Sequence, residues 1–67
     1  MIFKKYTPLI DDIVKVKHND TIGRVKKIVS LFGYRDMVIE ILYCHNKERE
    51  GEDYFVGIDM CKLIWRR

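Results

Sequence analysis

The chain of 67 residues has one proline, two cysteines and no apolar run near the 18 residues that a membrane-spanning helix needs. Lys4 and Lys5 follow directly after three apolar residues, so we expect no secretory signal peptide. Two cysteines are also too few for a disulfide framework. We therefore expect a cytoplasmic protein without membrane contact, in which Cys44 and Cys61 are free thiols that fill small apolar spaces.

Residues that could catalyse a reaction or bind a metal are scarce. Ser30 is the only serine, and the two histidines, His18 and His45, lie in polar segments. Neither Cys44 nor Cys61 belongs to a closely spaced cysteine pair of the kind that binds zinc. A domain of this size has little room for a pocket and its supporting residues. We expect no enzymatic activity, no metal and no cofactor.

What the chain does have is apolar material for one small domain, and an uneven charge. Hydrophobic residues make up 48% of the chain, and the net charge is +3. Residues 1–35 carry eight Lys or Arg against three Asp or Glu, whereas residues 36–67 carry five against seven. Such an asymmetry predicts a basic surface and an acidic loop on one body.

The first strand is predicted over Ile13–His18, where apolar and basic residues alternate. Residues 1–11 contain Pro8 and are expected to form an extended arm or short edge strand that packs onto the domain, with a single helical turn as the alternative. The polar residues at 18–20 predict a tight turn after the first strand.

The second strand is predicted over Ile22–Leu31, with an irregularity in its middle. Val25 and Ile28 are three residues apart, so a bulge or sharp coil near Lys26 and Lys27 is needed for both to face the core. Gly23 has no side chain and permits close approach of a neighbouring strand. Small barrels need such a bend in order to close.

The third strand, Met37–Tyr43, is the most β-prone segment. Its odd-numbered residues are expected to face the core, which leaves Val38 and Leu42 on a partly apolar second face. Because such a face is usually covered, we expect either the N-terminal arm or a partner to lie on it.

The second half of the chain predicts two more strands around two turns. The polar segment 45–53 is read as a hairpin loop with Gly51 in a left-handed conformation. Strands are predicted over 54–58 and 62–65, with one 3₁₀ turn at 59–61 between them. Trp65 is expected to close the end of the domain as a buried aromatic lid.

This order of strands, with a 3₁₀ turn before the last, resembles that of an SH3-like barrel. The chain also resembles the KOW motif of ribosomal proteins and transcription factors. The residues that carry this resemblance are Asp12, Val14, Val16, Ile22, Gly23, Arg24, Val25, Ile28, Val38 and Glu40. The resemblance implies an all-β fold: a five-stranded SH3-like barrel over residues 12–65, preceded by the arm 1–11, as one domain.

We expect this domain to be a binding or regulatory module that contacts nucleic acid or a nucleoprotein machine through a basic face. Cations spaced along neighbouring strands suit phosphates, and aromatic residues beside them could stack on bases. The predicted nucleic-acid-binding residues are Lys15, Lys17, Arg24, Lys26, Lys27, Phe32, Tyr34 and Arg35.

The alternative is a protein–protein interaction module, such as a small phage-type or mobile-element-type inhibitor or adaptor of a host protein. It would use the apolar second face together with the acidic hairpin. The predicted protein-binding residues are Val38, Leu42, Glu48, Glu50, Glu52 and Asp53. A homodimer formed through the segment Met37–Tyr43, or through an exchanged arm, is also possible.

Overall fold

Five antiparallel strands form one sheet in the computed structural model, which describes residues 6–30 and 32–67. The fold is all-β, as predicted. The elements, in chain order, are β1 (Ile13–Val16), β2 (Ile22–Val29), β3 (Asp36–Tyr43), the 3₁₀ turn η1 (Lys47–Arg49), β4 (Asp53–Gly57), the 3₁₀ turn η2 (Ile58–Met60) and β5 (Cys61–Trp65). The expectations for residues 1–5 and for Leu31 lie outside the described residues.

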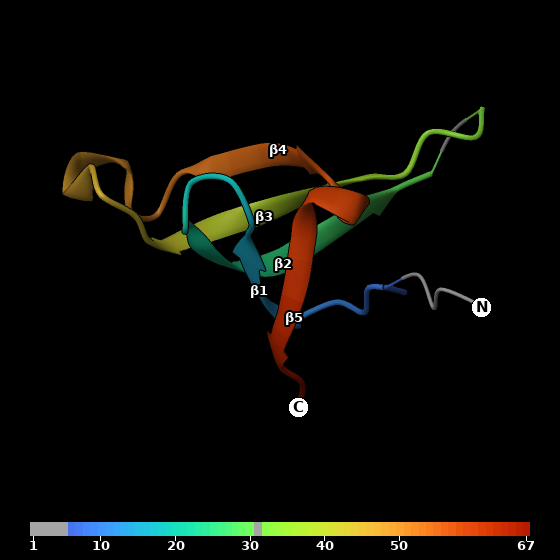
Figure 1. Ribbon diagram of the computed structural model, residues 1–67, viewed down its shortest axis with the longest axis horizontal. Helices are drawn as coiled ribbons and strands as arrows, with labels where there is room; N and C mark the ends of the chain where they lie inside the picture. Colours follow the sequence, from blue (N-terminus) through green and yellow to red (C-terminus); the bar gives the residue numbers. More distant parts are fainter. Residues whose placement is uncertain (1–5, 31) are drawn as a thin grey trace.

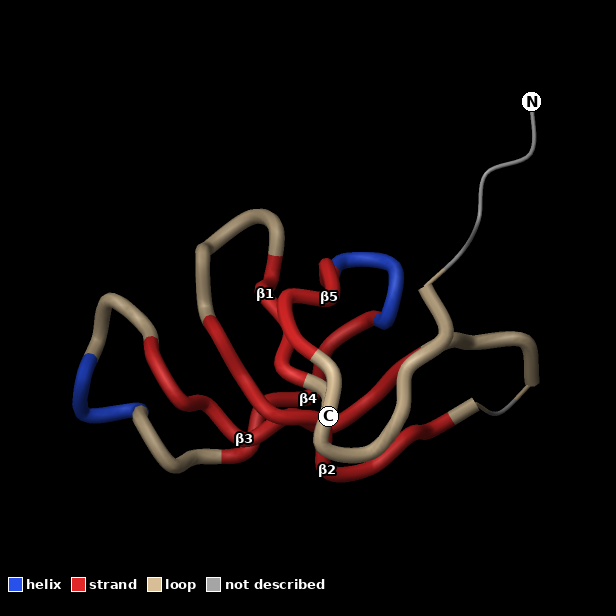
Figure 2. The backbone as a smooth tube through the Cα atoms, turned by 90° about the horizontal axis from the view of Figure 1, so that it is seen from below, coloured by secondary structure: helices blue, strands red, loops and turns tan. Residues whose placement is uncertain are grey.

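The sheet has the strand order β4-β3-β2-β1-β5, so β4 and β5 are its two edges. Each strand pairs antiparallel with its neighbours, and no pairing between β4 and β5 closes the sheet among the described residues. Figures 1 and 2 show a strongly twisted sheet, with the β3–β4 hairpin and the β2–β3 hairpin projecting at opposite ends of the molecule. The longest extent of the molecule is 39 Å.

The predicted bulge in β2 is present. Val25 pairs with Ile39 and Lys27 pairs with Val38, so Lys26 is the extra residue. Val25 is fully buried, but Ile28 remains 38% exposed, because this end of β2 runs past the core towards the β2–β3 hairpin.

Gly23 provides the close approach that the sequence indicated. A Cβ atom at this position would lie 2.6 Å from Ile39 Cδ1 and 2.9 Å from the backbone oxygen of Glu40 on β3. Contacts this short do not occur between real side chains and a neighbouring backbone, so only glycine fits here.

The core lies on one side of the sheet, the inward side. Met37, Ile39 and Ile41 of β3 are buried there, as predicted. Tyr43 was expected among them but is 47% exposed, because a register shift between Ile22 and Gly23 breaks the alternation. The buried core cluster consists of Val14, Val16, Val25, Met37, Ile39, Val56, Ile58 and Cys61.

Trp65 does not close the domain; that expectation was wrong. Its side chain is 56% exposed and pairs in register with Ile13, because a bulge separates this pair from the next pair, Val14 and Leu63. Without the bulge, Trp65 would lie on the same side as the buried Cys61. The aromatic rings that pack against the core are instead those of Tyr6, in the N-terminal arm, and Tyr54 of β4.

The remaining local expectations hold with shifted boundaries. The described part of the arm, 6–11, forms no strand; Tyr6 and Pro8 pack inward, whereas Leu9 and Ile10 are about half exposed. The second 3₁₀ turn begins at Ile58, one residue earlier than predicted. Both cysteines are buried free thiols, and Gly51 has the predicted positive φ of 90°. No helix in the described part of the chain is long and apolar enough to cross a membrane.

Candidate functional site

The predicted basic residues occupy three separate parts of the molecule. Lys15 and Lys17 lie on β1 and directly after it. Arg24, Lys26 and Lys27 lie along β2. Arg35 lies in the β2–β3 hairpin, together with the predicted aromatic residues Phe32 and Tyr34.

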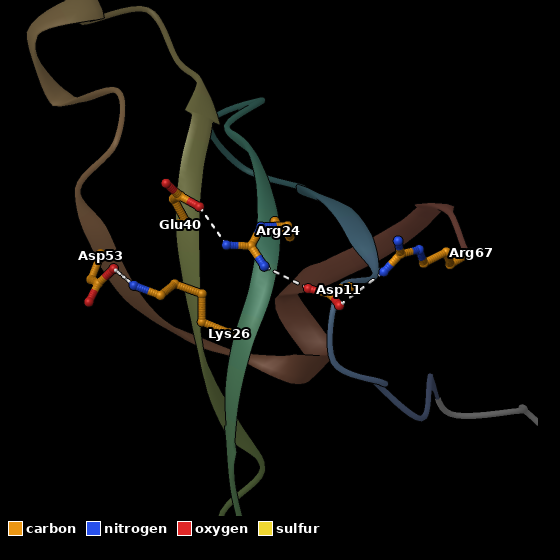
Figure 3. Close-up of polar contacts among 6 residues, drawn as sticks. All are labelled: Asp11, Arg24, Lys26, Glu40, Asp53 and Arg67. Atoms are coloured by element: carbon orange, nitrogen blue, oxygen red, sulfur yellow. Dashed lines mark hydrogen bonds and ion pairs between the residues drawn. The ribbon is translucent and has the colours of Figure 1, made fainter.

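On the outward side of the sheet, opposite the core, charged side chains form two separate sets of ion pairs (Figure 3). Lys26 Nζ lies 2.9 Å from Asp53 Oδ1. Arg24 contacts Glu40 Oε1 at 2.8 Å and Asp11 Oδ1 at 2.6 Å, and these two hydrogen bonds raise the pKa of its guanidinium further. Arg24 therefore links the arm, β2 and β3, and its charge is balanced where it stands.

Arg35 is also held in place by neighbouring groups. Its Nη2 donates to the backbone oxygen of Tyr6 at 2.6 Å, and its Nε lies 3.3 Å from Asp59 Oδ1 of η2. The aromatic residues of the same hairpin are free of the core: Phe32 is 94% exposed and Tyr34 is 72% exposed. Phe32 also has a positive φ of 53°, which is uncommon for a bulky residue.

A further set of exposed cations lies on β1 and β5, and Lys27 of β2 is exposed as well. Lys62 stands directly opposite Lys15 in the β1–β5 register, so both side chains share the outward side. Like charges in this arrangement destabilise a sheet. Lys17 follows at the end of the same ladder, where its backbone N–H donates to Met60 O at 2.9 Å. We call Lys15, Lys17 and Lys62 the lysine row.

The contacts of the lysine row are loose. Lys15 Nζ lies 3.3 Å from Asp20 Oδ1, and the side chains are 46% and 60% exposed. Lys17 Nζ donates to the backbone oxygen of Asp59 at the long distance of 3.4 Å. Exposed pairs of this kind contribute about 0–1 kcal/mol, so a phosphate could replace them.

Two exposed residues of β5, Lys62 and Trp65, are not among the predicted site residues. Lys62 could have been found by pairing β1 with β5 in register, since both strands carry a lysine between two inward apolar residues. Trp65 could not have been found in this way, because alternation along β5 places its side chain on the inward side. The bulge beside Ile13 moves the side chain to the outward side.

The predicted protein-binding residues lie on the other half of the sheet. Val38 pairs with Phe55 of β4, and Phe55 is 61% exposed. Leu42 is 44% exposed and is separated from Val38 by Glu40, which contacts Arg24. The acidic residues Glu48, Glu50, Glu52 and Asp53 are exposed around η1 and at the start of β4; Glu52 contacts Arg49 at 3.3 Å and Asp53 contacts Lys26.

One buried carboxylate lies away from both surfaces, at the junction of the arm and the C-terminal residues. Asp12 accepts hydrogen bonds from Tyr6 Oη at 2.6 Å, from the backbone N–H of Leu9 at 2.9 Å and from Arg66 Nη2 at 2.8 Å. Arg66 is the main reason why the pKa of Asp12 falls to about 2, while burial and Asp12 raise that of Tyr6. Through Asp12, these contacts connect the arm and the C-terminal residues to the start of β1.

Comparison with protein-family models, with curated proteins and with solved structures finds no match for this chain. The described residues contain no group of three His, Cys, Asp or Glu side chains that could hold a metal ion, and they enclose no pocket. What the described surface offers is exposed cations on β1, β2 and β5 and exposed aromatic side chains.

Proposed function

We propose that this protein is a small, non-enzymatic binding module that contacts nucleic acid, alone or within a nucleoprotein complex, through the lysine row. The observation that carries the proposal is the pairing of Lys15 with Lys62 on adjacent strands. Two like charges held side by side weaken the sheet, whereas a bound phosphate would turn their repulsion into attraction. The row therefore has an electrostatic arrangement that an anionic ligand completes.

The ion pairs of three other predicted cations support the choice of this row. Arg24 and Lys26 lie within 3 Å of carboxylates, and Arg35 lies between Asp59 and the arm. These cations would have to give up existing contacts before they could bind phosphates. Asp59 contacts both Lys17 and Arg35, so the row continues towards the hairpin that exposes Phe32 and Tyr34, which remain proposed as base-stacking residues.

The finer fold assignment is part of the same proposal. The strand order β4-β3-β2-β1-β5 and a 3₁₀ turn before the last strand support an SH3-like barrel over residues 12–65. The resemblance to the KOW motif remains part of this proposal and rests on the sequence, including Gly23 and Arg24. The two buried free thiols suit the cytoplasm, where we propose that the protein acts.

The test compares two triple variants in binding to labelled DNA and RNA oligonucleotides. The first, Lys15→Gln, Lys17→Gln and Lys62→Gln, removes the lysine row and should abolish binding at physiological salt. The second, Lys26→Gln, Lys27→Gln and Lys47→Gln, removes the same charge from β2 and η1 and should retain most of it. Equal loss in both variants would show that net charge alone attracts the ligand, against the proposal.

A second candidate, contact with a protein, is favoured by the cross-strand pair of the partly buried Val38 and the exposed Phe55. Large apolar side chains side by side on a sheet surface are typical of interfaces. β3 already pairs with β2 and β4, so a homodimer through β3 would use its outward side chains rather than its backbone. Phe55→Asp should abolish association with a protein partner or a second copy while leaving oligonucleotide binding intact, and unchanged association would contradict this candidate.

A further inference from the structure

We infer that Trp65 is a stacking platform for an unpaired base, and that the ligand of the lysine row is single-stranded nucleic acid. The inference rests on the proposed function and extends it to a residue that the sequence placed in the core. It starts from where the bulge between β1 and β5 puts the indole.

Trp65 is the only tryptophan in the chain and is 56% exposed. Large aromatic side chains are usually well buried in small domains, because they contribute much of the core. Here the bulge moves the indole to the outward side, opposite Ile13, where it lies on the same surface as Lys15 and Lys62. Half of a large aromatic side chain is therefore available to a ligand next to cations.

The charges around Trp65 favour a polyanion as the occupant. Lys62 lies three residues before it on β5, a separation of about 10 Å along an extended strand. Arg67, two residues after it, is 81% exposed at its side chain and reaches Asp11 only at 3.7 Å. The surface thus combines an exposed π-face with cations on both sides of it, which is the combination that single-strand-binding proteins use.

The exposed indole also favours single strands over duplexes. A base within a duplex is stacked on both faces and cannot offer one to a side chain unless the duplex is opened. The bases of a single strand have free faces, and base–aromatic stacking does not depend on sequence. We therefore expect a preference for single strands, with little sequence specificity from this contact.

Because Trp65 is the only tryptophan, its intrinsic fluorescence reports on this contact directly. The experiment titrates the full chain with an unlabelled single-stranded oligonucleotide and with the matching duplex, and measures affinity separately by anisotropy of labelled oligonucleotides. Saturable quenching by the single strand, at the concentration where anisotropy changes, is the expected result. Equal affinity for the duplex would overturn the single-strand assignment.

Variants separate stacking from folding. Trp65→Ala should weaken single-strand binding about 5-fold or more, whereas Trp65→Phe, which keeps an aromatic face, should retain most of the affinity. Phe55→Ala removes a similarly exposed aromatic side chain from the other half of the sheet and serves as the comparison. Circular dichroism melts of all three variants identify any loss that is due to unfolding.

The outcomes distinguish the two levels of the proposal. If oligonucleotides bind but Trp65 fluorescence does not change and Trp65→Ala binds like the parent, the stacking role is wrong and the proposed function stands. If Phe55→Ala loses as much affinity as Trp65→Ala, the stacking surface is misplaced. If no oligonucleotide binds to the parent even at low salt, the proposed function itself fails.

Discussion

Replacing Lys62 with glutamate should stabilise the fold and weaken nucleic-acid binding at the same time. Lys62 lies directly opposite Lys15, so the substitution exchanges a repulsive cross-strand pair for an attractive one. Cross-strand charge pairs contribute about 0.2–1 kcal/mol. Lys15 already contacts the exposed Asp20 at 3.3 Å, so we expect the lower half of that range. A gain of about 0.5 kcal/mol raises the Tm of a domain of this size by roughly 2–4 °C.

The same substitution removes one phosphate contact and adds an anion to the lysine row. Binding should weaken, and the plot of log affinity against log salt should become less steep by about 1. The matched control is Lys47→Glu, which makes the same charge change in η1, within the hairpin that projects from one end of the molecule (Figure 1). A lower Tm for Lys62→Glu, or binding equal to that of Lys47→Glu, would refute the reasoning.

Three further substitutions or reactions test the fold. The pKa of Asp12 is lowered from 3.8 to about 2, so the stability it contributes is complete above pH 4 and is lost as the pH falls towards 2. Asp12→Asn should therefore lower the Tm at pH 7 and flatten the dependence of Tm on acid pH. A pH profile of the variant parallel to that of the parent would contradict the role of Arg66. Gly23→Ala should cost about 1–3 kcal/mol in chemical denaturation, because its Cβ would overlap Ile39 and the β3 backbone; an unchanged midpoint would contradict the close packing. Burial raises the pKa of Cys61 to about 11, so its thiol should react with a disulfide reagent at pH 8 only after denaturation. Rapid labelling of Cys61 in the native protein would contradict the packing of β5 against the core.

Local patterns in the sequence predict much of this fold because they follow from strand geometry. Alternation identified the inward residues of β1 and, apart from Tyr43, those of β3, and the three-residue spacing of Val25 and Ile28 predicted the irregularity in β2. The left-handed conformation of Gly51 also follows from local constraints. These features depend on neighbouring residues in the chain, so one sequence is enough to find them.

Features that depend on pairing between distant strands could not be predicted in this way. The bulge that exposes Trp65 arises where β5 meets β1, and the lysine pair arises from the same register. The sequence likewise shows that Arg24 is basic, but not that Glu40 and Asp11 balance it. A basic face drawn from sequence alone therefore included cations that the fold holds in ion pairs and omitted Lys62.

The most direct test of nucleic-acid binding by the lysine row is the salt dependence of affinity for a single-stranded oligonucleotide. Three phosphate contacts predict a slope of about −2 for log affinity against log salt, or a loss of roughly twentyfold between 50 and 200 mM. That slope in the parent, reduced in the variant that lacks the three lysines, is the predicted result. Binding that does not change with salt, or no binding at the lowest salt, would contradict the account.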